Sequence, residues 1–289
     1  MFNHAIEMKI YIVKTFFVWI VAVGLLSACG SDARKVKEND IRFDTMALKE
    51  SYHIKNIETN PGCSLQINFV FPVEYQNQQV LKAVQQQFVG AFLGDDYMQS
   101  SPREAVNQYA ENYLNDFKKR ETDFESDVEE HGSEPNDEWY SSYEILSDSI
   151  YYNQNDLLSM VVSKEYDTGG AHNAHHYTNR VIDLKTGERV TEAAVFIEDY
   201  QDDLAKIIVD AIALYNNVDK ASDLENIGFF NVNEIYPNKN FYVDEVGITY
   251  TFNEYEIAAY VVGATSVRIP YEKIRHLLRK ESPIAHIAF

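Results

Sequence analysis

A short apolar segment near the start of the chain ends in Leu-Ser-Ala-Cys at 26–29, and this ending limits how much of the chain folds. Lys9 and Lys14 precede the segment, and the small residues before Cys29 have the order of a lipobox, where a bacterial lipoprotein is cleaved and acylated. The apolar run is shorter than the roughly 20 residues that span a bilayer. We therefore assign residues 1–28 to a lipoprotein signal peptide and Cys29 to lipidation. An ordinary secretory peptide with a chance cysteine is the alternative.

Cleavage at this point leaves about 260 residues with only one further cysteine, Cys63. A disulfide framework is therefore impossible, and the stability of the mature chain has to come from packing. The hydrophobic content of 45% is sufficient for one large or two modest domains. We expect a lipid-anchored, extracytoplasmic protein of the bacterial cell envelope, either periplasmic or surface-exposed.

The charge of the chain is strongly one-sided, with 45 acidic against 25 basic residues and a formal net charge of -20. Such a surface repels nucleic acid and attracts basic proteins. We therefore exclude nucleic acid as a partner and retain a basic protein as a candidate. The alternative is that the acidity serves only solubility.

Periodicity predicts the α+β class, in which antiparallel sheets pack with amphipathic helices in two associated subdomains. The polar residues 29–50 are typical of a flexible tether. We expect an N-terminal α+β domain over 51–138 and a C-terminal one over 139–289. Strands are predicted at 64–72, 139–150, 157–166, 177–184, 241–243, 247–252 and 266–269, and helices at 80–92, 102–117, 199–217 and after Pro270.

The segment from Glu121 to Glu138 holds nine acidic residues and no Lys or Arg, and Gly132 and Pro135 interrupt it. This composition predicts a solvated loop. A docking surface for a basic partner is the alternative. Its candidate residues are Glu125, Asp127, Glu129 and Glu130.

A glycine-rich connection between two predicted strands, Asp-Thr-Gly-Gly-Ala-His at 167–172, contains the candidate binding residues Asp167, Gly169, Gly170 and His172. Three imidazoles, those of His172, His175 and His176, suggest a transition-metal site. However, a strand directs His175 and His176 to opposite faces. Adjacent glycines also have a conformational explanation, because they supply positive φ in a tight connection. We therefore predict neither a metal nor a cofactor, although metal binding by this cluster stays open.

Catalytic signatures are missing from the sequence, which has no Gly-x-Ser-x-Gly elbow, no His-Glu-x-x-His helix and no phosphate-binding glycine loop. We therefore expect no enzyme. Aromatic residues near the middle of the chain offer sugar-stacking platforms, but packing between strands is the more common use of such residues. They are Trp139, Tyr140, Tyr143, Tyr151 and Tyr152.

Four short motifs resemble the signature pieces of one family of extracytoplasmic domains. They are Tyr-Asp-Thr-Gly-Gly-Ala-His at 166–172, Asp-Leu-Lys-Thr-Gly at 183–187, Asn-Glu-Tyr-Glu-Ile-Ala at 253–258 and Ile-Pro-Tyr at 269–271. The family is the RsiV-like domain of unknown function 3298. It forms the outer part of a lysozyme-sensing anti-sigma factor and accompanies the catalytic domain of the peptidoglycan deacetylase PdaC.

The resemblance covers roughly residues 150–280, and the region from about 52 to 125 is similar to the domain of unknown function 4163 that usually precedes the family domain. It implies a non-enzymatic binding module for a lysozyme-like protein or for peptidoglycan. The alternative hypothesis is a cell-wall hydrolase, possibly metal-dependent, with its site around Asp167 and His172. The sequence does not give the ligand, the membrane leaflet or the oligomeric state.

Overall fold

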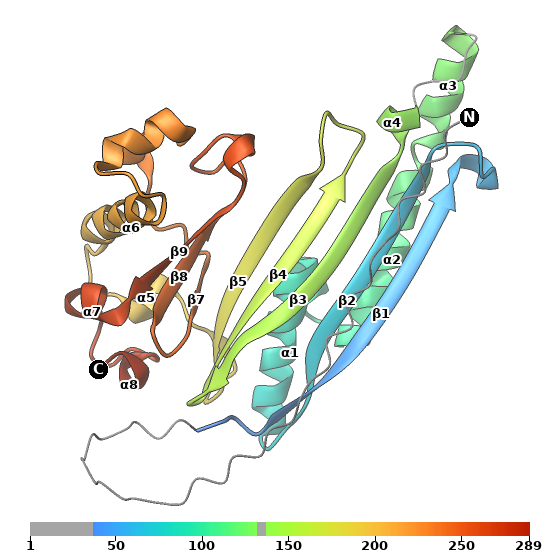
Figure 1. Cartoon of the computed structure of the whole chain (residues 1–289). Helices are drawn as coiled ribbons and strands as arrows, with labels where there is room; N and C mark the ends of the chain where they lie inside the picture. The colour runs from blue at the N-terminus through green and yellow to red at the C-terminus, as the bar shows by residue number, and fades with distance from the viewer. Residues whose placement is uncertain (1–36, 132–136) are drawn as a thin grey trace, which may run out of the picture. The chain divides into compact units, whose positions relative to one another are not determined.

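The computed structural model describes residues 37–131 and 137–289, and its largest element is a six-stranded sheet (Figure 1). The strand order is β1-β2-β3-β4-β5-β6, and every neighbouring pair is antiparallel except β2 and β3. A second, antiparallel sheet has the order β7-β8-β9. The strands are β1 (Ile41–His53), β2 (Gly62–Tyr75), β3 (Ser142–Gln154), β4 (Leu157–Asp167), β5 (Ala174–Asp183), β6 (Glu188–Arg189), β7 (Phe241–Val243), β8 (Gly247–Phe252) and β9 (Thr265–Pro270).

The helices occupy connections between these strands and the segment after β9. They are α1 (Gln78–Leu93), α2 (Pro102–Lys118), α3 (Glu121–His131), α4 (Asp137–Tyr140), α5 (Glu192–Val195), α6 (Gln201–Tyr215), α7 (Tyr271–Ile274) and α8 (Ala285–Ala288). The mixed α+β class is therefore as predicted.

Helices α1 and α2 cover one face of the large sheet, as their apolar stripes predict. The side chain of Asn77 caps α1 by accepting a bond from the backbone N–H of Gln79 at 3.0 Å. Before α2, the backbone N–H of Ser101 donates to the Glu104 carboxylate at 3.1 Å. The stacked rings of Phe69 and Phe92, with centroids 4.2 Å apart, join the sheet to α1. This packing forms the first of two large cores.

The second core joins the other face of β4 and β5 to the small sheet and α6. Alternation along β5 directs Val181 into this core and Ile182 into the first. The apolar stripe of α6 supplies the fully buried Leu204 and Ile208. The sheet itself therefore connects the two cores.

Two predicted boundaries are wrong. The tether does not extend to residue 50, because residues 41–50 belong to β1. This edge strand has only one neighbour and is largely exposed, so it lacks the apolar alternation that reveals a buried strand. The predicted domain boundary between residues 138 and 139 is also not observed. Strands β1 and β2 precede this point in the sequence and β3–β6 follow it, yet all six form one sheet.

Two predicted element ends also differ. Strand β2 continues through Pro72 to Tyr75. Its pairing with β1 shifts register between Arg42 and Phe43, and this irregularity accommodates Pro72, which pairs with Phe43. The helix after Pro270 stops at Ile274 instead of continuing. The backbone there forms tertiary bonds, including one from the N–H of Ile197 to the carbonyl of Leu277 at 2.9 Å. Long-range backbone pairing thus replaces the helix that local pattern favours.

The first described residues dock on the β3–β4 turn. The Asn155 N–H donates to the Lys37 carbonyl at 2.7 Å, and the Asn39 side chain donates to the Leu157 carbonyl at 2.8 Å. The chain thus enters the folded body at the end of the sheet opposite the β4–β5 connection. Within residues 37–131 and 137–289, no helix is long and apolar enough to cross a bilayer.

Candidate functional site

Asparagine side chains that flank β7 and β8 complete the outer edge of β5. Strand β6 pairs only with Ile182 and Asp183, so among the described residues the first part of β5 has no strand on that side. The Asn253 side chain accepts from the Tyr177 N–H at 2.6 Å, and Asn240 accepts from the Asn179 N–H at 2.7 Å. The Asn-Glu-Tyr-Glu motif at 253–256 therefore has a structural role, because it joins the small sheet to the edge of β5.

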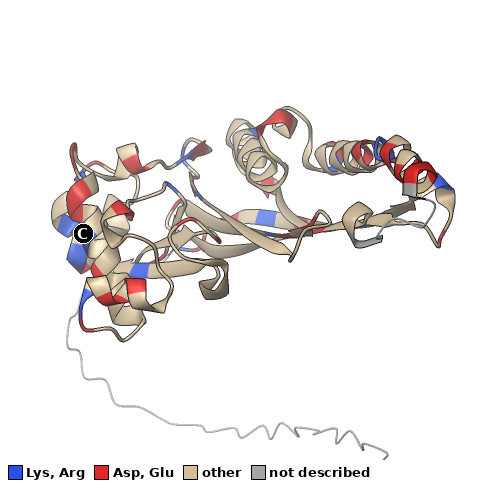
Figure 2. Cartoon of the chain, turned by 90° about the horizontal axis from the view of Figure 1, so that it is seen from above, with Lys and Arg blue, Asp and Glu red and all other residues tan. Residues whose placement is uncertain are grey.

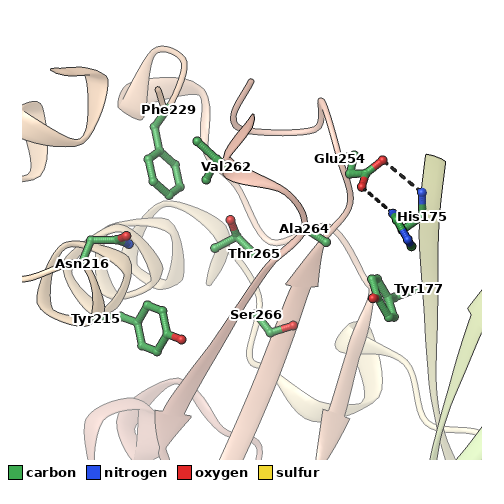
Figure 3. A pocket seen from close by; sticks show the side chains of 10 residues that line it. All are labelled: His175, Tyr177, Tyr215, Asn216, Phe229, Glu254, Val262, Ala264, Thr265 and Ser266. Atoms are coloured by element: carbon green, nitrogen blue, oxygen red, sulfur yellow. Dashed lines mark hydrogen bonds and ion pairs between the residues drawn. The ribbon is translucent and has the colours of Figure 1, made fainter. Parts of the chain in front are cut away.

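The same edge fixes an acid–imidazole–acid array. Glu254 accepts two bonds from His175, one from the backbone N–H and one at Nδ1, both at 3.0 Å (Figure 3). The other ring nitrogen, Nε2, lies 3.8 Å from a carboxylate oxygen of Glu165. Only 9% of the Glu254 side chain is exposed, against 34% for His175. The imidazole is thus oriented by a buried carboxylate and presents Nε2 to a second, more exposed one.

The connection between β4 and β5 is built as a tight turn. The Asp167 side chain accepts from the Gly169 N–H at 2.7 Å, and Gly169 has a positive φ of 85°. Gly170 does not have a positive φ, so only one of the two glycines fills the predicted conformational role.

An exposed aromatic stack stands beside this connection. The ring of His172 lies parallel to that of Tyr260, with centroids 3.8 Å apart, and its Nε2 is 3.0 Å from the hydroxyl of Tyr255. Tyr255 is 55% exposed and has a left-handed φ of 63°, which a bulky side chain rarely adopts. We call the surface formed by Asp167, Gly170, His172 and Tyr255 the loop surface.

A hollow of about 450 Å³ lies beside the loop surface, and Asp167, Gly170 and His172 line it together with Ser142 and Tyr143. The Tyr143 hydroxyl donates to Glu165 at 2.8 Å. This bond, with a second from Asn173, holds the pKa of Glu165 below its usual value. Three of the four predicted residues of the connection therefore meet at one solvent-accessible hollow.

The three histidines do not converge on a common point. His172 contacts Tyr255, His175 contacts Glu254, and His176 faces the other side of β5, in register with Lys164. Within the two described ranges, no group of three or more His, Cys, Asp or Glu side chains has the geometry of a metal site.

The acidic segment is helical where it is described, and the prediction of a loop is wrong for residues 121–131. Glu121 and Asp123 lie in the first turn of α3, where the helix dipole favours them, and Phe124 is buried. The turn signals Gly132 and Pro135 lie outside the described residues. A charged composition does not exclude a helix, because the buried Phe124 anchors this one.

Acidic residues are concentrated on α3 (Figure 2). The four candidates there differ in their surroundings. Glu125 forms an ion pair with Lys55, and Asp127 accepts a bond from the Tyr140 hydroxyl. Glu129 and Glu130 are exposed. None of the four lines the hollow beside Asp167, so the structure does not bring the two predicted sets together in that hollow.

The aromatic candidates also separate by exposure. Trp139 is 70% exposed, whereas Tyr152 is only 4% exposed. Tyr151 is exposed but its ring lies 5.0 Å from that of Tyr242, and Tyr140 packs on Phe124. Packing therefore accounts for Tyr140 and Tyr152, while Tyr143 belongs to the hollow.

Sequence reasoning missed Glu165, Glu254, Tyr255 and Tyr260 as members of the site. Glu165 is an ordinary strand residue in sequence and carried no signal. The other three lie in a polar and aromatic segment that follows the apolar strand at 247–252, and this contrast was the available signal. Only the fold shows that the segment reaches β5.

Comparisons with known proteins identify the C-terminal part of the chain. A crystal structure of a DUF3298 family member from Bacteroides fragilis NCTC 9343 is similar, with 27% identity, a TM-score of 0.81, and coverage of 87% of this chain and 98% of that one. A DUF3298 family protein from Pseudomonas aeruginosa PAO1 has 13% identity and a TM-score of 0.60, covers 84% of this chain and 96% of that one, and shows the fold alone. No curated protein matches. Residues 193–272 match the family described as "Protein of unknown function (DUF3298)", a shorter span than the resemblance predicted, and this chain therefore contains a DUF3298 domain.

Proposed function

We propose that the chain is a lipid-anchored binding protein of the bacterial cell envelope, and that its loop surface binds a basic protein of the lysozyme type. The main support is the exposed Tyr255 ring, which the backbone holds in a strained left-handed conformation against His172. Strain of this kind is concentrated at functional sites, and exposed rigid aromatic side chains are frequent anchors of protein interfaces.

Charge near the loop surface supports a basic partner. Asp167 lines the hollow, and Glu165 of β4 and Glu254, which follows β8, both lie beside His175 at the start of β5. Interfaces with complementary charge associate rapidly at low salt and weaken as salt screens the charges. The proposal thus predicts an affinity that falls clearly between low and moderate salt.

The expected anchor at Cys29 is consistent with an outward-facing loop surface. The described chain enters the body at the β3–β4 turn, and the eleven residues of β4 separate this turn from the loop surface by about 36 Å. The described chain therefore begins at the end of the sheet that is distant from the loop surface.

The test is a titration of the full chain in mild detergent against lysozyme and against soluble muropeptides, each at low and moderate salt. We expect Tyr255→Ala to weaken lysozyme binding by about tenfold or more, as truncation of an aromatic anchor does. Tyr151→Ala is the matched control, because Tyr151 is similarly exposed, at 57%, but lies near the other end of the large sheet. Equal affinity of both variants for lysozyme would remove the loop surface from the proposal.

A cell-wall hydrolase is the second candidate, and one observation supports it. His175 is oriented through Nδ1 by a buried carboxylate, which is the arrangement of a general base. His172 is a poorer candidate, since both of its ring nitrogens already have partners, the Asn173 carbonyl and the Tyr255 hydroxyl. Release of soluble fragments from purified peptidoglycan, lost in His175→Gln and kept in His176→Gln, is the expected result. No release by the native chain would exclude this candidate.

A further inference from the structure

A second cavity lies beside the His175–Glu254 pair, between the edge of β5 and the end of α6 (Figure 3). Its volume of about 580 Å³ is within the range of small-ligand sites, roughly 300–1,000 Å³. The chain segments that form it are far apart in sequence: β5, the end of α6, the start of β9 and the residue Phe229. We call it the β5–α6 pocket.

One end of the β5–α6 pocket is acidic. Glu254 lines it, and the two bonds from His175 fix the orientation of its carboxylate. When the imidazole is neutral, this pair keeps the negative charge of the carboxylate. None of the ten residues that line the pocket is Lys or Arg, so the His175 imidazole is the only basic group of the wall.

The remaining wall combines aromatic and aliphatic side chains with hydrogen-bonding groups. The rings of Tyr177, Tyr215 and Phe229 provide surface for an alkyl chain, and an aromatic face also attracts a cation. Asn216 uses its amide nitrogen to bond the Ile212 carbonyl, which leaves its side-chain oxygen as an acceptor toward the pocket.

We propose that the β5–α6 pocket binds a primary ammonium group carried on an alkyl stem. A carboxylate that is held in place, side-chain oxygens and aromatic walls fit the head and the stem of such a group. Two sources share this chemistry: a lysine side chain of a basic protein, and the diamino acid of a wall peptide. The inference rests on the proposed function, because it identifies the chemical group of the ligand that the same body holds.

The test measures the binding of two small probes to the full chain, by calorimetry or by saturation-transfer NMR. The probes are Nα-acetyl-lysine N-methylamide and the same compound acetylated on its side-chain nitrogen. We expect the second probe to bind at least tenfold more weakly, because acetylation removes the charge. Equal binding of both probes, or no binding of the first to folded protein, would overturn the proposal.

Three variants locate the binding. Glu254→Gln keeps the shape of the side chain and should weaken the first probe at least tenfold, whereas Glu111→Gln on the exposed face of α2 should leave it unchanged. Tyr215→Ala removes a ring that is 74% exposed at the rim, so it should weaken the probe severalfold without unfolding the chain. Equal losses in Glu254→Gln and Glu111→Gln would contradict a role for the pocket.

Two further experiments distinguish the two sources of the ammonium group, and they separate the pocket proposal from the proposed function. Acetylation of the lysozyme amines should reduce binding if the protein supplies the ammonium group, and acetylated muropeptides should lose binding if the wall peptide does. Lysozyme binding that needs Tyr255 but not Glu254 would retain the proposed function and reject the pocket. If the probe binds in a way that needs Glu254 but lysozyme does not bind, the pocket is retained and lysozyme binding as the proposed function is rejected.

Discussion

Asp148 offers a sharp test of the packing, because it is a carboxyl group buried where two parallel strands separate. The last paired residues of β2 and β3 are Asn68 and Ser147, and beyond them the Val70 N–H donates to the Asp148 side chain at 2.8 Å. The second carboxyl oxygen of Asp148 has no hydrogen-bond partner in the described part of the chain. The residue is only 9% exposed, and burial raises its pKa to about 7.

The sign of the effect follows from the two pKa values. Between the ordinary value of 3.8 and the folded value of about 7, the folded chain holds a proton that the unfolded chain has released. The free energy of unfolding therefore falls as pH rises through this window and is constant above it. At 1.36 kcal/mol per pKa unit, the full cost of the charged form is about 4 kcal/mol, of which about 2.5 kcal/mol develops between pH 5 and pH 8.

Asp148→Asn removes the ionisation and keeps an acceptor for Val70. We expect the stability of the variant relative to the native chain to rise by about 2.5 kcal/mol from pH 5 to pH 8, measured by urea denaturation followed by circular dichroism. Asp210→Asn, at an exposed position of α6, is the control and should show no such change. A difference between native chain and Asp148→Asn that stays constant over this pH range would refute the reasoning.

Three other predictions concern the cores. Leu204→Ala should reduce the free energy of unfolding by about 2–5 kcal/mol in urea denaturation, because Leu204 is fully buried; a loss below about 1 kcal/mol would contradict its place in the core. Gly247→Ala should prevent stable folding, since an added Cβ would collide with the Ile269 backbone carbonyl; a native thermal melt would disprove this close approach. Cys63 should react with iodoacetamide only after denaturation, because burial raises its pKa to about 11; rapid alkylation in the native state, detected by peptide mass mapping, would contradict its burial.

The sequence was sufficient for the buried elements of the fold. Helices α1, α2 and α6 and strands β2–β5 and β7–β9 carry apolar side chains on every face that packs into a core, and the sequence shows this pattern. The β3–β4 hairpin was also predictable, since Asn155 and Asp156 both adopt the positive φ that such turns favour. Elements that are stabilised by packing into a core can therefore be predicted from their pattern of apolar residues.

The elements that sequence reasoning missed are those without a buried pattern of their own. Strand β1 is largely exposed, and α3 is anchored through Phe124 among many acidic residues. The parallel pairing of β2 with β3 joins segments separated by both α1 and α2, and no local signal encodes it. The predicted domain boundary was wrong for the same reason.

The candidate site was partly predictable. The turn at Asp167 and Gly169 and the position of His172 follow from local chemistry, and the structure brings Asp167, Gly170 and His172 to one hollow. Tyr255, the partner of His172, lies 83 positions away, and Glu254, the partner of the nearby His175, lies 79 positions away from that residue. Only the tertiary fold creates this proximity. The acidic residues of α3 form a separate surface.

Hydrogen–deuterium exchange of the full chain with and without saturating lysozyme examines the loop surface without any substitution. We expect protection of backbone amides in residues 167–176 and 253–262, which carry His172, Tyr255 and the edge of β5. Protection confined to α3, or no change at a lysozyme concentration that saturates binding, would contradict recognition through the loop surface.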